Sequence, residues 1–250
     1  MAKSMYIKIF LLVIAISINC LSQDINTNIL LRVFLVKYQN NAGSAFTIEY
    51  DNKQYLISAA HIFQGISQNS SIEIFHDSKW KILNVRRIGI VQDSVDIIVF
   101  SANFQLSPVY DMPASLTHII IGQDIYFLGF PFGITTNMQT LNKYFPLPLV
   151  KKGILSGFFQ KGKGTVTMMY FDAINNAGFS GGPIIFYDKI DKKLKIAGVV
   201  SAYVNQFDKV ILQGQETQLQ ALTNSGFLIG YSIEHALEQI RKDPNGCLIK

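Results

Sequence analysis

The sequence has little cysteine, little charge and no block of basic residues, and each shortage excludes a class of protein. Its 250 residues include two cysteines, Cys20 and Cys247, so we expect a fold that disulfides do not hold together. Charged residues make up 16% of the chain and hydrophobic residues 49%, which argues against disorder and for a large buried core. The formal net charge is +5, but no run of Lys and Arg accompanies it, so we expect no nucleic-acid partner.

The spacing of metal ligands and a long apolar segment are also missing. The four histidines and two cysteines form no cluster with the ligand spacing of a metal site, so the sequence predicts no metal and no other cofactor. The longest apolar run, over residues 9–18, is shorter than the ~18 or more residues of a membrane span. We therefore expect no stable membrane span.

This apolar run has the features of an export signal. Two lysines flank its start, and its length matches the ~7–15 residues of a signal-peptide core. Cys20 and Ser22 are small enough for the cleavage-site positions, so we expect residues 1–22 to be a signal peptide and the mature protein to be secreted or periplasmic. The alternative is a lipoprotein acylated on Cys20, although the preceding residues fit a lipobox poorly.

Beyond residue 23 the chain is rich in short runs of β-forming residues, separated by Asn, Gly and Lys-Gly turn signals. Many short strands at regular spacing predict an all-β fold rather than alternating strands and helices. The runs divide near residues 108–115 into two groups, each long enough for one six-stranded antiparallel barrel. We expect strands over 30–36, 44–50, 54–58, 71–75, 82–87, 97–100, 124–128, 152–158, 165–171, 183–187, 195–200 and 226–231.

One helix is predicted, at the end of the chain. Ser232 is a good N-cap, and apolar residues recur behind it at helical spacing. Two segments, 134–150 with its prolines and 204–224 with its many glutamines, suggest long loops. The sequence thus predicts a signal peptide and two domains: an N-terminal barrel over 23–115 and a C-terminal barrel over 116–250 that includes the final helix.

A single serine stands among glycines in the segment GFSGGP, residues 178–183. Glycines on both sides of Ser180 indicate backbone that bends tightly or is approached closely, although a plain glycine-rich turn before a strand would have the same composition. A serine hydroxyl is a weak nucleophile unless an imidazole takes its proton. If Ser180 is a nucleophile, a histidine must therefore lie close to it in the fold.

His61 is the best placed of the four histidines for that task. It follows a predicted strand and two alanines, whose small side chains leave the ring free to project into a cleft. The base needs a carboxylate to orient it. Asp96 opens an apolar strand and, if drawn into the interior, requires a partner, whereas Asp93 in the preceding turn has the weaker claim.

Several motifs in order resemble the trypsin-like serine peptidases. These are SAF at 44–46, YLISAAHIF around His61, DIIVF from Asp96 and GFSGGP around Ser180. The closer resemblance is to the HtrA/Deg-type protease domain, to whose motifs IYFLGFPFGI, VKKGILSG and FDAINNAGFSGGPII are similar. The resemblance runs from about residue 30 to the end of the chain. Each motif is short, but their joint occurrence in this order is specific.

The resemblance implies a catalytic triad and an oxyanion hole. Ser180 would attack the scissile carbonyl group, His61 would transfer the proton, and Asp96 would orient the imidazole. The backbone N–H groups of Gly178 and Ser180 would bind the oxyanion. Phe179 stands where trypsin has an aspartate that pairs with a new N-terminus, so activation by that ion pair is not expected.

The resemblance also implies a substrate pocket. Ile174 would lie at the base of the S1 pocket, and Ser201, Ala202 and Tyr203 would form its wall, with Ser201 also beside the buried aspartate. An apolar base and a phenol ring at the mouth favour small or medium apolar residues before the scissile bond. No PDZ module is expected after the last helix, so the peptide sensing and cage assembly of HtrA proteins are not carried over.

The function predicted from these residues is a secreted or periplasmic serine endopeptidase acting on protein or peptide substrates. The alternative is a non-catalytic binding module on the same fold, because a fold alone does not determine function. An esterase of the α/β-hydrolase type is not favoured, because neither its nucleophile elbow nor its order Ser, Asp, His is present.

Overall fold

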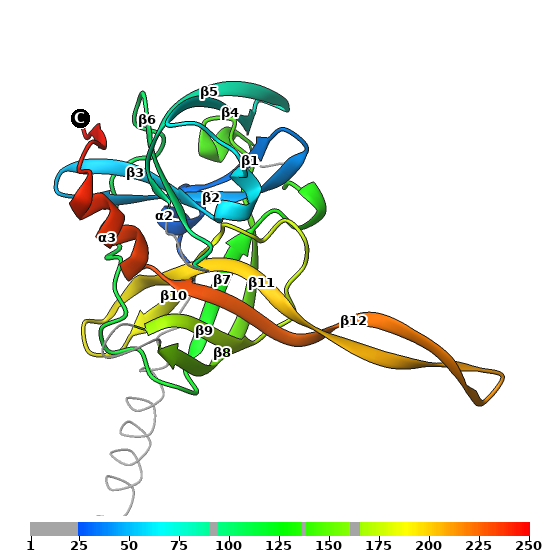
Figure 1. The fold of residues 1–250 in the computed structure, drawn as a ribbon. Helices are drawn as coiled ribbons and strands as arrows, with labels where there is room; N and C mark the ends of the chain where they lie inside the picture. Colours follow the sequence, from blue (N-terminus) through cyan, green and yellow to red (C-terminus); the bar gives the residue numbers. More distant parts are fainter. Residues whose placement is uncertain (1–24, 91–94, 137–138, 161–165) are drawn as a thin grey trace, which may run out of the picture.

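The computed structural model describes residues 25–90, 95–136, 139–160 and 166–250, which form two closed β-sheets, one above the other in Figure 1. The predicted signal peptide over 1–22, with Cys20, and the alternative carboxylate Asp93 lie outside the described residues. Among the described helices, none combines the length and the apolar character that crossing a bilayer requires.

The first sheet is a ring in which each strand pairs antiparallel with its neighbours, in the order β3-β2-β1-β4-β5-β6, and β6 pairs with β3 to close it. Apolar side chains of these strands form a buried cluster, in which the rings of Phe63 and Phe100 meet edge to face. The strands are β1 (Val33–Tyr38), β2 (Asn41–Tyr50), β3 (Lys53–Ser58), β4 (Asn69–His76), β5 (Lys79–Ile90) and β6 (Ile98–Ala102).

The second sheet is a closed antiparallel barrel in the order β10-β11-β12-β9-β8-β7. Its strands are β7 (Asp124–Gly129), β8 (Leu149–Gln160), β9 (Val166–Asp172), β10 (Pro183–Asp188), β11 (Lys193–Leu212) and β12 (Gln215–Ser232). The predicted fold class, two six-stranded antiparallel barrels, is confirmed, and every predicted strand is present.

The end of the chain returns to the first ring. Helix α3 (Glu234–Lys242) contacts β5 and β6, and the short strand β13 (Cys247–Leu248) pairs with β3. The predicted apolar stripe of this helix is buried, and the Ser232 hydroxyl accepts a hydrogen bond from the Glu234 N–H at 3.2 Å. The helix that was assigned to the C-terminal domain therefore packs on strands of the N-terminal one.

The remaining described elements are short. They are α2 (Thr27–Leu30) and three 3₁₀ turns, η1 (Ala60–Phe63), η2 (Pro131–Gly133) and η3 (Gln139–Asn142). The expected loop over 134–150 contains η3 and, where it is described, an isolated bridge between Thr136 and Leu147 before β8 begins.

The prediction of a loop over 204–224 is wrong, because this segment is the outer part of a β-hairpin. Strands β11 and β12 continue past the barrel and meet at Gln213 and Gly214, whose φ angles of 50° and 81° suit a tight hairpin turn. The segment has no face buried against a core, so it lacks the alternation of apolar and polar residues by which strands are recognised in a sequence.

Candidate active site

Three elements supply the candidate catalytic residues. His61 lies in η1, directly after β3, and Asp96 lies just before β6, so both come from the first ring. Ser180 lies in the turn that precedes β10 of the second barrel. The Ser44 N–H in β2 donates to the Ser180 carbonyl oxygen at 2.8 Å, which fixes the turn of the second barrel against the first ring.

His61 is held by Asp96 at two points. The His61 backbone N–H donates to Oδ1 of Asp96 at 2.8 Å, and ring Nδ1 lies 2.6 Å from Oδ2. A carboxylate opposite Nδ1 favours the tautomer with the proton on that nitrogen, which leaves Nε2 as an acceptor. The imidazole is 45% exposed and the carboxylate 17%, so the ring is open to a substrate while its partner is shielded.

Ser201 completes the surroundings of the carboxylate. Its hydroxyl donates to Oδ2 of Asp96 at 2.5 Å. Burial opposes ionisation of Asp96, but the hydrogen bonds and charge of His61, together with the Ser201 hydroxyl, outweigh burial and lower the pKa of the carboxyl below its usual value. Asp96 is therefore ionised at neutral pH and carries the charge that stabilises a protonated imidazole.

The Ser180 hydroxyl donates to the Ser201 carbonyl oxygen at 2.9 Å. Among the described residues, the Ser180 hydroxyl makes this hydrogen bond and none to the His61 ring. Ser201 therefore bridges the two halves of the site, with its side chain on Asp96 and its carbonyl group on Ser180.

The turn before Ser180 has the geometry of a type II turn. The Phe179 N–H donates to the Asn176 carbonyl oxygen at 3.2 Å, and Gly178 has φ of 105°, which such a turn requires at its third position. A Cβ on Gly178 would lie 2.2 Å from the Phe130 carbonyl oxygen. Both the backbone angle and the lack of space restrict this position to glycine.

The central peptide of this turn is held from outside. The Phe132 N–H, in η2, donates to the Ala177 carbonyl oxygen at 2.8 Å. Because a trans peptide points its C=O and N–H in opposite directions, this bond turns the Gly178 N–H away from Phe132. In the described part of the chain, neither the Gly178 N–H nor the Ser180 N–H donates to another group.

Ser44 clamps the same turn through its side chain. The buried Ser44 hydroxyl donates to the Gly178 carbonyl oxygen at 2.7 Å and accepts from the Phe130 N–H at 3.1 Å. Gly181 lets the two barrels come this close, since a Cβ there would lie 2.0 Å from the Ser44 carbonyl oxygen. Sequence reasoning used Ser44 only as part of a motif and missed this contact.

Phe179 anchors the turn in the core of the second barrel. Its ring is 1% exposed, packs edge to face on Phe127 at 4.9 Å between ring centres, and lies under the Lys151 ammonium at 5.7 Å. The same ammonium donates to the Ile174 carbonyl oxygen at 2.5 Å and to Oδ1 of Asn176 at 3.0 Å. Apolar packing and the contacts of Lys151 therefore hold this turn in place.

The predicted pocket residues lie on two neighbouring segments. Ser201 is buried, whereas Ala202 and Tyr203 are exposed. Both exposed residues lie where β11 has passed the end of its pairing with β10. Ile174 is 59% exposed, which is more open than the floor of a closed pocket. Its assignment as the base of S1 stays a prediction.

Asn175 links these two segments and was missed by sequence reasoning. Its side-chain N–H donates to the Ala202 carbonyl oxygen at 3.3 Å, and its own carbonyl oxygen accepts from the Asn224 side chain at 2.6 Å. Asn175 is 2% exposed, and its Oδ1 is buried without a hydrogen-bond partner among the described residues. No sequence pattern distinguishes it from the neighbouring asparagine.

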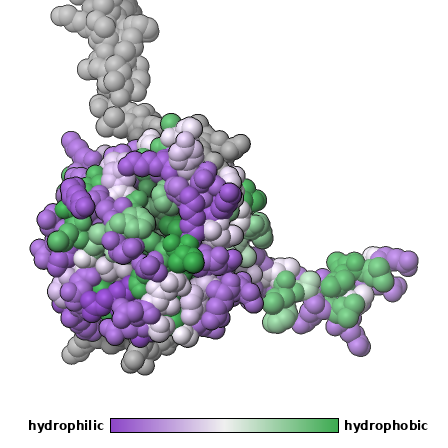
Figure 2. All heavy atoms as spheres, turned by 90° about the horizontal axis from the view of Figure 1, so that it is seen from above, coloured by the Kyte–Doolittle hydropathy of each residue, from purple (hydrophilic) through white to green (hydrophobic). Residues whose placement is uncertain are grey.

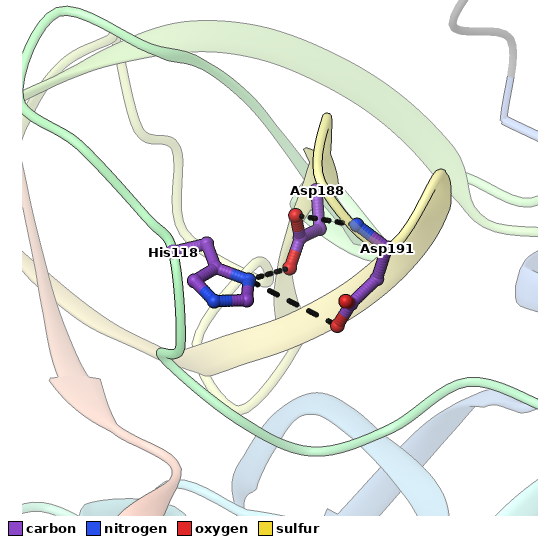
Figure 3. A group of neighbouring side chains, drawn as sticks. All are labelled: His118, Asp188 and Asp191. Atoms are coloured by element: carbon purple, nitrogen blue, oxygen red, sulfur yellow. Dashed lines mark hydrogen bonds and ion pairs between the residues drawn. The ribbon is translucent and has the colours of Figure 1, made fainter.

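A second histidine–carboxylate group lies away from this site, at the turn between β10 and β11 (Figure 3). His118 Nδ1 is 2.9 Å from Oδ2 of Asp188 and 4.0 Å from Oδ2 of Asp191. The buried Lys195 ammonium contacts both carboxylates. Because this ammonium already neutralises much of the negative charge, we assign the group a structural role in the turn.

Comparisons with known proteins agree with this geometry at the level of the fold. No protein-family model matches the sequence, and no curated protein matches it significantly. Solved structures do match. An inactive form of Rv3671c from M. tuberculosis H37Rv superposes with a TM-score of 0.54 at 15% identity, over 86% of this chain and 88% of that one.

The HtrA-type protease AlgW, in complex with a tripeptide, superposes with a TM-score of 0.56 at 19% identity, over 86% of this chain. The chain has the HtrA-type protease fold. It spans 61% of the AlgW chain, and a second inactive-form structure of the Rv3671c protease matches over 90% of its length with a TM-score of 0.54. At these identities the likeness concerns the fold, and the chemistry rests on the residues of this chain.

Proposed function

We propose that the protein is a serine endopeptidase with Ser180 as nucleophile, His61 as general base and Asp96 as the residue that orients His61. The observation that carries the proposal is the two-point contact of His61 with Asp96, joined to Ser180 through Ser201. The HtrA-type fold supports it, because the solved structures that share this fold include named proteases.

The reaction begins when the Ser180 hydroxyl turns from the Ser201 carbonyl group to Nε2 of His61. His61 takes the hydroxyl proton as Oγ bonds to the scissile carbonyl carbon, and then gives that proton to the leaving amine as the peptide bond breaks. Water, deprotonated by the same imidazole, hydrolyses the acyl-enzyme and restores the free hydroxyl. Asp96 stays ionised throughout and stabilises the imidazolium.

The negative oxygen of the tetrahedral intermediate would be bound by the N–H groups of Gly178 and Ser180. The fixed Ala177–Gly178 peptide supports this assignment, as does the lack of another partner for either N–H among the described residues. Loss of one such donor typically raises the barrier by about 3–4 kcal/mol.

We also propose a preference for small or medium apolar residues before the scissile bond, with Ile174 near the base of the pocket and Ser201, Ala202 and Tyr203 along its wall. The Tyr203 ring narrows the mouth, so Tyr203→Gly is expected to extend the preference toward Phe. Profiling of cleavage sites in a peptide library tests this, and dominant cleavage after Lys, Arg or Glu would refute it.

Export is part of the proposal, supported by the lysine-flanked apolar run before residue 23. Mass spectrometry of the mature protein is expected to find an N-terminus near Gln23. A diacylated Cys20 would establish the lipoprotein alternative, and an intact Met1 on cytoplasmic protein would refute export.

A non-catalytic binding module on the same fold is the second candidate. The observation in its favour is the hydrogen bond of Ser180 to the Ser201 carbonyl group, which leaves the hydroxyl unbonded to His61. The two candidates make opposite predictions for a reagent that reacts only with an activated serine.

Labelling by a fluorophosphonate therefore tests the proposed function. Wild-type protein is expected to label and to cleave casein, Ser180→Ala to do neither, and Ser156→Ala, which replaces an exposed serine of β8, to behave as wild type. Absence of labelling and cleavage in the wild type, with candidate activators and mild heating included, would leave the binding module as the better account.

A further inference from the structure

The outer half of the β11–β12 hairpin stands away from both barrels as a two-stranded arm (Figure 1). Strand β10 pairs with β11 only as far as Val199, and β9 pairs with β12 only from Phe227 onward. We call residues 204–224 the arm, and within it each strand pairs, among the described strands, only with the other. Apart from positions 210, 217, 223 and 224, all of its residues are exposed. The arm therefore lies outside the cores of both barrels.

One side of the arm is polar and forms hydrogen bonds within itself. Gln206 lies opposite Thr223 and Asp208 opposite Ala221 in the ladder, and residues opposite each other on paired strands share one side of the sheet. The Asp208 carboxylate accepts hydrogen bonds from the Gln206 side chain at 3.2 Å and from the Thr223 hydroxyl at 2.5 Å. We call this the polar side, and it meets part of its hydrogen-bonding demand within the arm.

The opposite side carries a large apolar pair, and we call it the apolar side. Phe207 lies opposite Leu222, and because side chains alternate along a strand, both point away from the polar side. Their exposed fractions are 69% and 59%. Ile211, Leu212 and Leu219 extend the apolar surface to the tip of the arm, seen as green patches in Figure 2. A two-stranded ribbon with no packed face is marginally stable in water, so we expect a partner to cover this surface.

The charges of the arm select neither an acidic nor a basic partner. Its ionisable residues are Asp208, Lys209 and Glu216, and Lys209 pairs with Glu216 at 2.6 Å. The arm is thus close to neutral in a chain whose formal net charge is +5. Two arms can therefore approach each other with little repulsion, although the molecule as a whole is positively charged.

The size and reach of the arm suit a second copy of the same chain. Residues 204–224 approach in number the ~20–30 residues that each partner brings to a stable protein interface. In an antiparallel arrangement the tip of one arm reaches the base of the other, where Val204 and Phe227 are also partly exposed, at 36% and 46%. A twofold axis repeats this contact between tip and base. Because the arm stands clear of the barrels (Figure 1), the two bodies lie at opposite ends of the pair.

We propose that the arm is a dimerisation element. Two copies of this chain associate by laying the apolar sides of their arms together, antiparallel, about a twofold axis. The contact is isologous, since the same surface of each copy faces its equivalent in the other. The inference goes beyond the proposed function and does not depend on it, because the oligomeric state is measured without catalysis.

Sedimentation velocity in a reductant, which prevents disulfides through Cys247, tests the proposal. Wild-type protein is expected to be a dimer at about 100 µM, because interfaces of this size reach Kd values of micromolar or lower. The double variant Phe207→Gln, Leu222→Gln is expected to raise the dimer Kd at least about 100-fold, since four large apolar side chains per dimer lose their cover. Ile82→Gln is the control: Ile82, on β5, is 77% exposed, and its replacement is expected to leave the Kd within about twofold.

An arm-shortened variant makes the test independent of these two side chains. Replacing residues 206–223 by Asn-Gly closes the hairpin at Asn205 and Asn224, which face each other in the ladder. This variant is expected to be a monomer that unfolds as cooperatively as wild-type protein, because both barrels are left intact.

Cross-linking identifies the side of the arm that makes the contact. A photo-reactive p-benzoylphenylalanine at position 207 is expected to link two copies on illumination, whereas the same group at position 206, on the polar side, is expected to link few. A wild-type monomer at about 100 µM, a dimer that survives arm shortening, or equal cross-linking from the two positions would overturn the proposal. So would a monomer whose arm binds anionic lipid vesicles or an extended apolar peptide, because a different occupant would then cover the arm.

Discussion

Two histidine–aspartate pairs stand out in the described part of the chain, and they differ in whether their surroundings suit a catalytic base. His61 faces Asp96 at 2.6 Å, and His118 faces Asp188 at 2.9 Å, each through Nδ1. In both, backbone N–H groups also bind the carboxylate and the pKa of the aspartate is lowered. The pairs are therefore alike in the two features by which catalytic histidines are usually sought.

They differ in the third partner of the carboxylate. The Lys195 ammonium neutralises the Asp188 carboxylate, so the His118 imidazole adds little to the stabilisation of that charge. Asp96 instead accepts the neutral Ser201 hydroxyl, which leaves His61 as its cationic partner once the ring is protonated. A carboxylate without a lysine can stabilise an imidazolium. Asp96 also links His61, through Ser201, to a serine whose turn is fixed from both barrels.

The largest effect is expected from replacing the carboxylate of the first pair. Asp96→Asn presents an amide N–H to Nδ1 of His61, which forces the proton onto Nε2 and prevents this nitrogen from accepting the Ser180 proton. We expect kcat to fall by about 10⁴, measured on a peptide substrate and as the rate of fluorophosphonate labelling. The matched change in the second pair, Asp188→Asn, is expected to reduce stability and leave kcat of the folded enzyme within about twofold; similar losses of kcat in both variants would refute the comparison.

The next effect concerns stability and the second pair. Lys195→Met removes the ammonium from two carboxylates, one of them fully buried, and leaves an uncompensated charge. We expect the free energy of unfolding in urea to fall by about 3 kcal/mol, with kcat unchanged. Lys193→Met is the control, because its contact with Asp111 is 3.5 Å long and exposed and is worth under about 1 kcal/mol. Equal losses in the two variants would contradict the assigned role of Lys195.

A smaller effect is expected from loosening the nucleophile turn. Ser44→Ala removes the hydroxyl that binds Gly178 and Phe130, so the Gly178 N–H loses part of its fixed orientation. We expect kcat to fall about tenfold, in line with the loss of the hydrogen bond to the Gly178 carbonyl group. Thr47→Ala, on the same strand, also removes a buried hydroxyl, which contacts Ser107 at 2.6 Å. It is expected to lower stability without lowering kcat, and a loss of kcat equal to that of Ser44→Ala would show that the clamp is not specific.

These contrasts also show which parts of the molecule could be predicted from the sequence. The strands of the barrels were predicted because one face of each is buried, and His61, Asp96 and Ser180 because their side chains stand in ordered motifs. The Phe132 contact joins two backbone groups, which every residue carries, so no residue type marks it. The Ser44 hydroxyl binds backbone groups 86 and 134 positions away, and no local pattern in the sequence reveals those partners. The outer part of the β11–β12 hairpin, over 204–224, was predicted to be a loop because no core imposes a pattern on its residues.

The pairing of Lys195 with Asp188 illustrates the same limit. A lysine and an aspartate seven positions apart are unremarkable in a sequence, and they meet only because β10 and β11 are joined by a hairpin whose register brings them together. The strands themselves were predicted, but the register was not. Contacts across strands follow from register, and register depends on the turn and on which side chains the barrel buries.

The smallest expected effect is on the pH dependence of stability, and it ranks the two aspartates. Burial opposes ionisation of both, but the hydrogen bonds of Lys195, Asp191 and His118 lower the pKa of Asp188 well below its usual value, and those of His61 and Ser201 lower the pKa of Asp96 less. A carboxyl whose folded pKa lies below its unfolded value of about 3.9 stabilises the fold above that pH, and this stabilisation is lost as the pH falls toward the folded pKa.

We therefore expect the contribution of both groups to be complete from about pH 5 to 7 and to decline below about pH 4. In urea unfolding at pH 6, 5, 4 and 3, Asp188→Asn is expected to reduce the decline of the unfolding free energy more than Asp96→Asn does. His118→Asn, which leaves Lys195 in place, is expected to change this slope little, because the lysine bond outweighs the histidine bond in lowering the pKa of Asp188. A flatter curve for Asp96→Asn than for Asp188→Asn would mean that the catalytic pair, and not the structural one, carries the stronger electrostatic contribution to folding.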